Sequence, residues 1–297
     1  MQPPLIPADV RSRLKDLRLL ARRASGQRGV GLHHSRSRGA GLEFAQYRGY
    51  EPGDELRQID WKLYARSDRF FVREAERESP LTVWLLIDGS ASMQQIESGD
   101  GRSRLQAAQI LAACIAELAL RQGDRFGFIG LCSDGLQLLG PGQGSRHRDR
   151  LWLALQRMRA HGGLVEGDQL LPVWQRIAAN DLVIALGDFF DDASIALCER
   201  LAAAGREVIA LPILSSDERD FPFRGGHLFV DPETGEQLPG DAASMREDYL
   251  RRFGQARQGL QARLQAAGIR HATCYMDQPL DQPLRQLFAG RAGTGPA

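Results

Sequence analysis

Cysteine and lysine are both scarce in this chain. The cysteines lie far apart with no C-x-x-C pair, which favours small buried side chains in a reducing compartment over a disulfide framework or a zinc site. Lysine occurs only at Lys15 and Lys62, so arginine supplies most of the positive charge. The net charge of +1 over 297 residues gives no global attraction to nucleic acid or to a membrane surface. The cysteines are Cys114, Cys132, Cys198 and Cys274.

Long apolar runs and targeting signals are also missing. No apolar run approaches the ~20 residues that a membrane-spanning helix needs. Residues 1–7 lack the charged and apolar regions of a secretory signal peptide. From these absences we expect a cytoplasmic protein without a transmembrane segment.

One local charge imbalance lies at the start of the chain. Residues 1–40 contain nine arginines and lysines but only two acidic residues, Asp9 and Asp16. This excess is typical either of a basic arm that contacts phosphates or an acidic partner, or of a solvated helix face in an arginine-rich chain. Apolar residues at helical spacing predict an amphipathic helix over 9–24, and the glycine-rich stretch 26–41 is expected to be a loop.

The motifs of the common hydrolases are absent as well. The chain has no Gly-x-Ser-x-Gly elbow, no H-E-x-x-H pair and no phosphate-binding loop, so we expect it not to be an enzyme. One alternative is a metal-dependent phosphohydrolase that uses Asp88 and Asp188, because residues 187–192 fit the Gly-Asp-x-x-x-Asp loop of haloacid-dehalogenase-type phosphatases. Those enzymes also need Asp-x-Asp, and here Ser90 stands where the second aspartate should be.

The chain is organised around one apolar stretch and the polar residues that follow it. Residues 81–87 are almost entirely apolar and too short for most helices, so they predict a strand buried on both faces, as in a parallel sheet. Asp88, Ser90 and Ser92 follow in alternation. Their oxygens are of the kind that Mg²⁺ or Ca²⁺ prefers, and ligands of open α/β sheets bind beyond the carboxyl ends of the strands. The alternative is a polar turn in which Ser90 or Ser92 only caps the next helix.

Strand-like and helix-like segments alternate along the rest of the chain. This pattern predicts an α/β fold with a mostly parallel sheet flanked by helices. The apolar strand 181–187 is followed by Asp188, which should reach the same sheet edge as Asp88. Two short strands with a turn are predicted within 227–238. The other predicted strands lie at 124–133, 207–214 and 269–276, and the predicted helices at 105–121, 148–160, 168–178, 193–204, 241–267 and 280–288.

The loop that begins at Asp88 resembles a known metal site. Its sequence, Asp-Gly-Ser-Ala-Ser-Met, is similar to the Asp-x-Ser-x-Ser opening of the metal-ion-dependent adhesion site in von Willebrand factor type A domains. That resemblance implies a site for Mg²⁺, with Mn²⁺ or Ca²⁺ as substitutes. The implied ligands are Asp88, Ser90, Ser92 and Asp188.

The middle loop of this chain departs from the type A pattern. Type A domains offer a threonine hydroxyl after two glycines, whereas Leu164 occupies that position here. Leucine cannot ligate a metal, so Glu166 or Asp168 would have to substitute, directly or through water.

A longer motif precedes the Asp88 loop and resembles the bacterial family called "domain of unknown function 58". The resemblance extends over roughly residues 30–290. The charged residues of the motif could form either a buried ion network or a docking surface. Asp54 is placed to cap a short helix that carries Trp61. The motif runs Arg48-x-Tyr-x-Pro-Gly-Asp54-x-x-Arg57-x-Ile-Asp60-Trp61, followed by Ala65-Arg66.

The family resemblance also implies a domain organisation and a function. It implies a type A-like domain over residues 80–290, an amino-terminal segment 1–79 packed against it, and a disordered tail at 291–297. We expect a non-catalytic module for protein–protein recognition, in which the metal bridges to a partner carboxylate. The implied partner is a MoxR-type AAA+ ATPase in a bacterial chaperone or assembly role.

Overall fold

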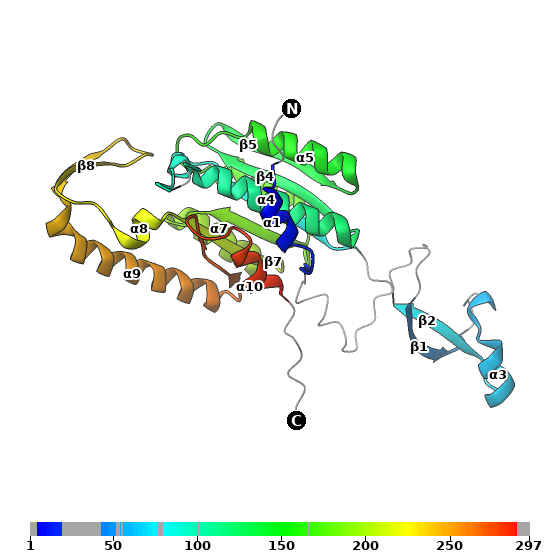
Figure 1. The fold of residues 1–297 in the computed structure, drawn as a ribbon. Coiled ribbons are helices and arrows are strands. Elements are labelled where there is room, and N and C mark those ends of the chain that lie inside the picture. Colours follow the sequence, from blue (N-terminus) through cyan, green and yellow to red (C-terminus); the bar gives the residue numbers. More distant parts are fainter. Residues whose placement is uncertain are drawn as a thin grey trace, which may run out of the picture. The chain divides into compact units, whose positions relative to one another are not determined.

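The computed structural model divides the chain into two compact units (Figure 1). The main unit comprises residues 1–28 and 81–297, and the second unit comprises residues 29–80. The predicted loop at 26–41 and the predicted tail at 291–297 lie outside the described residues. The structure describes residues 5–19, 43–51, 54, 56–76, 80–99, 101–165 and 167–289.

A mostly parallel sheet forms the centre of the main unit. Within the described residues it has seven strands in the spatial order β10-β7-β6-β3-β4-β5, with β11 paired to β7. Every pairing is parallel except that of β4 with β5. The predicted α/β fold with a mostly parallel sheet is therefore confirmed. The strands are β3 (Thr82–Asp88), β4 (Arg125–Cys132), β5 (Gly135–Gly142), β6 (Leu182–Gly187), β7 (Glu207–Leu214), β10 (Arg270–His271) and β11 (Cys274–Tyr275).

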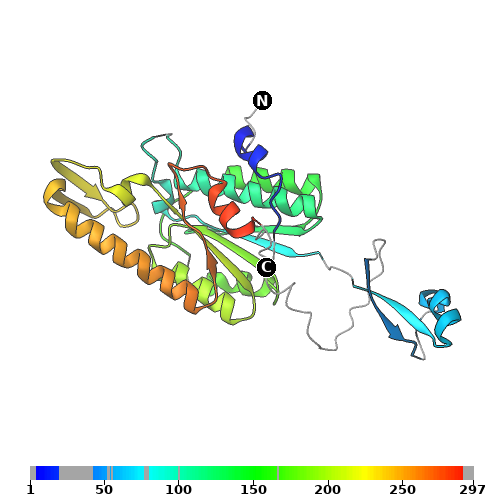
Figure 2. The same ribbon diagram turned by 60° about the horizontal axis from the view of Figure 1, so that its bottom comes forward.

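Helices cover both faces of this sheet (Figures 1 and 2). Alternate residues of β3 enter two separate cores: Leu85 packs under α1, α4, α5 and α10, and Leu86 packs under α6, α7 and α9. This two-sided burial explains why the strand is continuously apolar. Among the described helices, none is long and apolar enough to cross a membrane. The helices are α1 (Ala8–Arg13), α4 (Arg104–Gln122), α5 (Ser145–Arg157), α6 (Leu171–Arg176), α7 (Asp192–Ala203), α9 (Ala242–Ala266) and α10 (Gln282–Phe288).

Helix α4 is fixed at both ends. The Ser103 hydroxyl accepts a hydrogen bond from the Gln106 amide at 3.2 Å, and the Gln106 side chain accepts one from the Ser103 amide at 2.9 Å. This reciprocal capping box satisfies donors that the first turn would otherwise leave without partners. At the other end Gly123 takes a φ of +75°, a left-handed conformation that glycine adopts without steric cost. The caps hold Arg104, the first residue of α4, at the carboxyl edge of the sheet.

The first described residues belong to the core of the main unit. Val10 and Leu14 are at most 4% exposed and lie in the same core as α4. The Arg13 guanidinium forms an ion pair with the buried Asp281 carboxylate at 2.8 Å, which ties α1 to the start of α10. Apolar burial and a buried ion pair therefore both hold this segment against the sheet domain.

The structure bears on two features of the amino-terminal segment. Of the predicted segment 1–79, the described residues 5–19 lie in the main unit, where their apolar side chains complete its core. The predicted helix over 9–24 is shorter, since α1 ends at Arg13 and residues 17–19 have no regular structure. Its last residues, 20–24, lie outside the described part of the chain.

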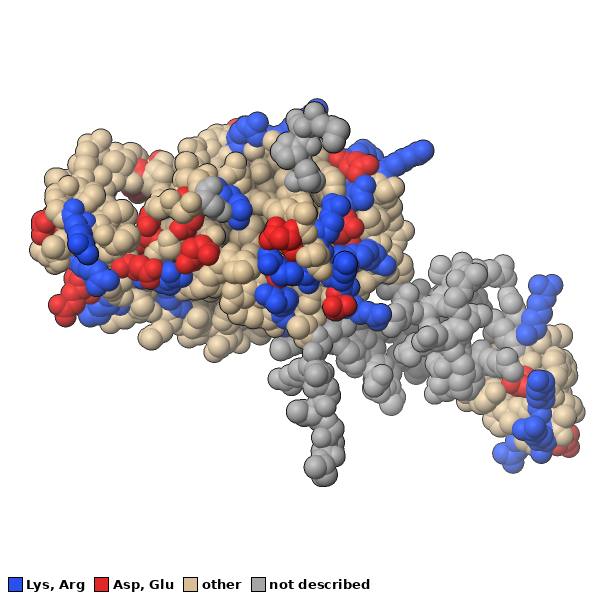
Figure 3. Space-filling model, viewed as in Figure 1, with Lys and Arg blue, Asp and Glu red and all other residues tan. Residues whose placement is uncertain are grey.

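The charged residues of the first segment are partly neutralised. Arg13 pairs with Asp9 at 2.6 Å as well as with Asp281. On the face shown in Figure 3, basic and acidic side chains of the main unit are intermixed, in keeping with the small net charge. The predicted alternative of a basic arm depends mainly on arginines beyond residue 19, which lie outside the described residues.

The second unit contains a two-stranded antiparallel sheet and a short helix. Strand β1 (Glu43–Gly49), which the sequence did not predict, pairs with β2 (Phe71–Glu76). Tyr64 stacks on Phe70 with ring centroids 4.4 Å apart, and Trp61 meets the same ring edge-on. These aromatic contacts hold α3 (Trp61–Ser67) against the start of β2.

The charged motif of the second unit has specific structural roles. Asp60, rather than the predicted Asp54, caps α3, because its Oδ1 accepts hydrogen bonds from the first amides of that helix. The other Asp60 oxygen accepts a hydrogen bond from the Tyr47 hydroxyl at 3.0 Å. Asp54 instead accepts two bonds of 2.9 Å from Arg48. The Arg48–Asp54 pair is thus an ion pair between two residues of the predicted network.

Smaller elements connect the main helices and strands. The predicted hairpin is present as an antiparallel pair, and the last predicted strand divides into β10 and β11 at residues 272–273. The smaller elements are η1 (Leu56–Gln58) of the second unit and, in the main unit, η2 (Ala91–Gln94), η3 (Gly167–Leu170), α8 (Ser216–Asp220), β8 (Gly226–Val230) and β9 (Gln237–Asp241).

Replacing Leu14 by alanine should lower the free energy of unfolding of the main unit by about 2–5 kcal/mol, because a fully buried leucine leaves a cavity. Urea denaturation followed by circular dichroism measures the change. The exposed neighbour Lys15 provides the control: Lys15→Ala should change the same free energy by less than about 0.5 kcal/mol. Equal values for the two variants would show that the segment is not part of the core.

Candidate functional site

The parallel pairing of β3 with β6 brings the two predicted aspartates together. Ile87 lies opposite Leu186 in the ladder, so Asp88 at the end of β3 and Asp188 just after β6 reach the same sheet edge. Carboxylate oxygens of Asp88, Asp188 and Asp191 all lie within 4.8 Å of one another. We call this edge the rim, and define it by Asp88, Ser90, Ser92, Asp188 and Asp191.

Close backbone packing fixes the Asp88 loop. A Cβ atom at Gly187 would lie 2.9 Å from the Asp88 Cβ, and one at Gly89 would lie 2.7 Å from the Cys132 sulfur. The Gly89 amide donates to the Leu131 carbonyl at 2.9 Å. Glycine at position 187 therefore leaves space for the Asp88 side chain beside the end of β6, and glycine at position 89 lets the Asp88 loop approach the end of β4.

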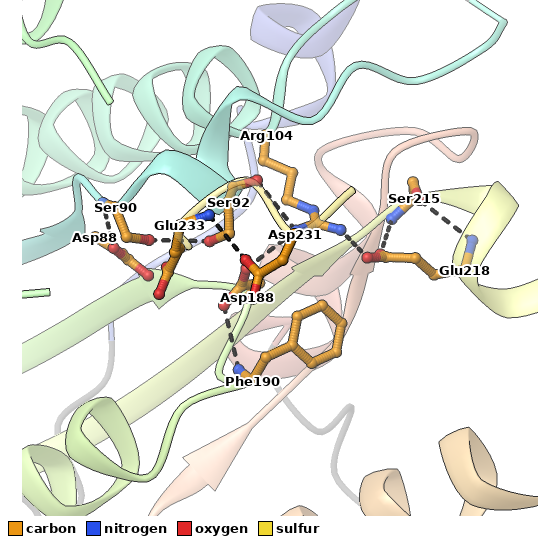
Figure 4. A network of polar contacts seen from close by, with 10 residues as sticks. All are labelled: Asp88, Ser90, Ser92, Arg104, Asp188, Phe190, Ser215, Glu218, Asp231 and Glu233. Atoms are coloured by element: carbon orange, nitrogen blue, oxygen red, sulfur yellow. Dashed lines mark hydrogen bonds and ion pairs between the residues drawn. The ribbon is translucent and has the colours of Figure 1, made fainter. Parts of the chain in front are cut away.

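The two predicted serines face the same space as the carboxylates (Figure 4). The Ser90 amide donates to Asp88 Oδ1 at 2.8 Å, and the Ser90 and Ser92 hydroxyl oxygens are 2.9 Å apart. The alternative prediction, that one of these serines caps the next helix, is not what the structure shows. Helix α4 is capped by Ser103, and Ser90 makes no side-chain capping bond to the short helix η2.

Burial makes the charge of Asp88 costly. The residue is 5% exposed, and its pKa is raised from 3.8 to about 7, first by desolvation and second by the negative charge of Asp188. Asp191 adds a smaller repulsion, whereas the hydrogen bonds from Ser90 act in the opposite direction. A proton or a cation at the rim relieves this cost.

Arg104 is a member of the site that the sequence did not reveal. It is 2% exposed, and its Nη1 donates to Asp188 Oδ2 at 3.0 Å and to the Ser92 carbonyl at 3.2 Å. Its other terminal nitrogen pairs with Glu218, and its guanidinium lies 5.4 Å from the centre of the Phe190 ring. Arg104 therefore neutralises part of the rim's negative charge, and its sequence context, an apolar helix, gave no signal of this role.

Neither described residue of the predicted middle loop, Leu164 or Asp168, belongs to the carboxylate group at the rim. Leu164 is half-buried and packs against the second core. Asp168 is exposed on η3, and Glu166 lies outside the described residues. Asp191, which the sequence did not select as a ligand, lies closer to the carboxylates, and its Oδ1 also caps α7 by accepting from the Ser194 amide at 2.7 Å.

The chemistry of the rim fits a hard divalent cation. It offers carboxylate and hydroxyl oxygens, which Mg²⁺, Mn²⁺ and Ca²⁺ prefer, with no sulfur or imidazole among the described rim side chains. The buried, mutually repelling Asp88 and Asp188 are the charges that such an ion would balance. Asp88, Ser90, Ser92 and Asp188 are the residues that could hold it, with Asp191 nearby.

We predict that Asp88→Asn stabilises the metal-free protein in a pH-dependent way. Because the folded-state pKa is raised from 3.8 to about 7, the folded chain binds this proton more tightly, and stability is lost as the pH rises from about 4 through 7. Between pH 5 and pH 8 the free energy of unfolding of the variant should therefore rise above that of the wild type, by on the order of 2 kcal/mol.

Urea denaturation in EDTA at several pH values measures this gain. Asp149→Asn, which changes an exposed carboxylate on α5, is the control and should follow the wild-type pH profile. Parallel profiles for Asp88→Asn and the wild type would contradict the raised pKa.

Comparison with known proteins finds related sequences and structures. The family model described as "Protein of unknown function DUF58" matches residues 46–259. Uncharacterised proteins of Mycobacterium tuberculosis and Mycobacterium bovis are each 26% identical over 218 residues, which cover 72% of this chain and 68% of theirs. One similar solved structure is the conserved hypothetical protein BatB from Bacteroides thetaiotaomicron, which is 13% identical; the match covers 70% of this chain and 98% of that chain, with a TM-score of 0.41. Another is the SpRpn10 VWA domain, which is also 13% identical; the match covers 74% of this chain and 100% of that chain, with a TM-score of 0.41.

Proposed function

We propose that this chain, which belongs to the family described as "Protein of unknown function DUF58", uses a divalent cation at the rim to recognise an acidic group on a partner protein. The observation that carries the proposal is the burial of Asp88 beside Asp188, with Asp191 within 4.8 Å. Like charges buried at such spacing are costly unless something neutralises them. Arg104 neutralises Asp188 on one side, and a cation would do so for Asp88.

The donor set leaves room for a partner. Mg²⁺ prefers six oxygens in near-octahedral geometry and usually keeps several waters. The proposed protein ligands are Asp88, Ser90, Ser92 and Asp188, and Leu164 adds none. A carboxylate from a partner protein could take one of the remaining positions, and its negative charge would complement the cation. Recognition would then depend on both the ion and the acidic group.

The sequence resemblance supports an AAA+ ATPase of the MoxR type as the partner. This chain has no phosphate-binding loop of its own, so a division of labour in which a separate protein hydrolyses nucleotide is consistent with its sequence. The role that the resemblance implies is chaperone or assembly work, with the present chain as the recognition module.

Capture experiments in Mg²⁺ and in EDTA test the proposal. The full chain should retain its partner, with a MoxR-type ATPase as the first candidate, in Mg²⁺ and lose it in EDTA, because chelation removes the bridging ion. Asp88→Ala should lower partner affinity in Mg²⁺ at least about tenfold, which corresponds to about 1.4 kcal/mol. Asp149→Ala removes an exposed carboxylate elsewhere and should bind like the wild type. If the wild type retains the partner in EDTA and Asp88→Ala retains it in Mg²⁺, the rim binds the partner without metal.

The metal-dependent phosphohydrolase that uses Asp88 and Asp188 is the weaker alternative. A second catalytic aspartate would stand at position 90, where the Ser90 hydroxyl instead meets Ser92. Asp188 is 2% exposed and held by Arg104, so it is poorly placed to handle a substrate proton.

We therefore expect no Mg²⁺-dependent hydrolysis of a general phosphatase substrate above the rate measured with Asp88→Asn. A colorimetric phosphatase assay on both proteins, with a known phosphatase as positive control, checks this. Turnover by the wild type that Asp88→Asn abolishes would favour the phosphohydrolase.

A further inference from the structure

The β8–β9 hairpin ends in a well-ordered turn. Asp231 Oδ1 accepts hydrogen bonds from the Glu233 amide at 2.8 Å and the Thr234 amide at 3.3 Å. The Gly235 amide donates to the Asp231 carbonyl at 2.8 Å, and Gly235 takes a φ of +73°. This Asx-type turn fixes the backbone of Glu233, so its side chain projects from a defined position.

The hairpin packs against other elements of the main unit through β8. Phe221 contacts both Phe229 of β8 and Tyr249 of α9, with ring centroids 5.8 Å and 4.5 Å apart. The Tyr249 hydroxyl donates to the Glu218 carbonyl at 3.1 Å, and the Glu218 side chain pairs with Arg104 of the rim. A series of side-chain contacts therefore links β8 to Arg104 of the rim.

The tip of the hairpin places a further carboxylate at the rim. Figure 4 shows the Glu233 side chain extending toward Ser90 and Asp88. The pKa of Glu233 is raised, first by desolvation and then by the charges of Asp188 and Asp191, while a hydrogen bond with the Ser90 side chain acts in the opposite direction. Glu233 therefore lies in the electrostatic field of the proposed ligands, although it lies far from them in sequence.

We propose that Glu233 is an internal ligand of the rim: with a cation bound, its carboxylate takes the position that an acidic group of the partner would otherwise occupy. This inference rests on the proposed function, since it concerns the same cation. The negative charges of Asp188 and Asp191 oppose the approach of the Glu233 carboxylate to the rim. With the ion, the same approach becomes attractive, so the cation draws the hairpin tip onto the rim. Leu164 supplies no oxygen, which leaves a position open for Glu233.

An internal ligand makes the hairpin a competitor of the partner. Glu233 is covalently connected to the rim, so it acts at a high effective concentration. A partner carboxylate gains access only by displacing the hairpin tip, and a partner with additional contacts on the surrounding surface does so more effectively than an isolated acidic group. The hairpin thereby raises the selectivity of the rim.

Two measurements on the full-length chain test the inference, with Mn²⁺ or Mg²⁺ alone as the probe. Calorimetric titration with Mn²⁺ should show an affinity about tenfold weaker for Glu233→Gln than for the wild type, because a charged ligand is lost. Hydrogen exchange should show that Mg²⁺ increases amide protection in β8, β9 and their turn in the wild type but not in Glu233→Gln. Glu236→Gln removes a charge from the same turn without touching the rim and should match the wild type in both measurements.

The outcomes separate this inference from the proposed function. If Asp88→Asn abolishes Mn²⁺ binding while Glu233→Gln and Glu236→Gln both bind like the wild type, the rim holds a cation but Glu233 is not its ligand. If the wild type binds no Mn²⁺, both proposals fall. Equal weakening by Glu233→Gln and Glu236→Gln would assign the effect to general electrostatics and would also overturn the internal ligand.

Discussion

Parallel pairing of β3 with β6 is the interaction on which the candidate site depends. In a parallel pair both strands finish at the same edge, so an aspartate at each carboxyl end must meet its neighbour. The sheet thereby forces Asp88 and Asp188 together in a buried environment. Several neighbouring residues accommodate this buried charge. Gly187 and Gly89 leave space, and the Ser90 amide donates to Asp88. Helix α4, which covers the sheet, contributes Arg104, which donates to Asp188.

Arg104 connects the rim to the outer part of the main unit. It lies between Asp188 and Glu218, and Glu218 also completes the capping box of α8 with Ser215. Tyr249 of α9 donates to the Glu218 carbonyl, so a polar chain passes from the sheet edge through α8 to the helix that supports the hairpin. Buried ion pairs of this kind add little to stability in general, because desolvation offsets much of the attraction. Their geometry nevertheless sets where the neighbouring carboxylates lie.

The sequence predicted the main sheet well because its signals are local. An apolar run bounded by polar residues is enough to recognise β3, β6 and β7, and helical spacing is enough for α4, α7 and α9. The family prediction is confirmed for the same reason: its motif is contiguous. Asp88 and Asp188 could be matched because each directly follows such a run. Arg104 and Glu233 could not, because only the folded chain brings a helix start and a hairpin tip to that edge. The Asp54 cap failed because two aspartates precede one helix and local spacing did not distinguish them.

The division of the chain has a mechanical consequence. The main unit is built from residues 1–28 and 81–297, so the second unit is an insertion with two covalent attachments. One attachment follows the segment whose Leu14 is fixed in the core, and the other leads directly into β3. Tension applied to an inserted unit is shared between both attachments, unlike tension on a domain carried by a single linker. Part of any load on the second unit is therefore carried by the attachment that leads into the strand ending in Asp88.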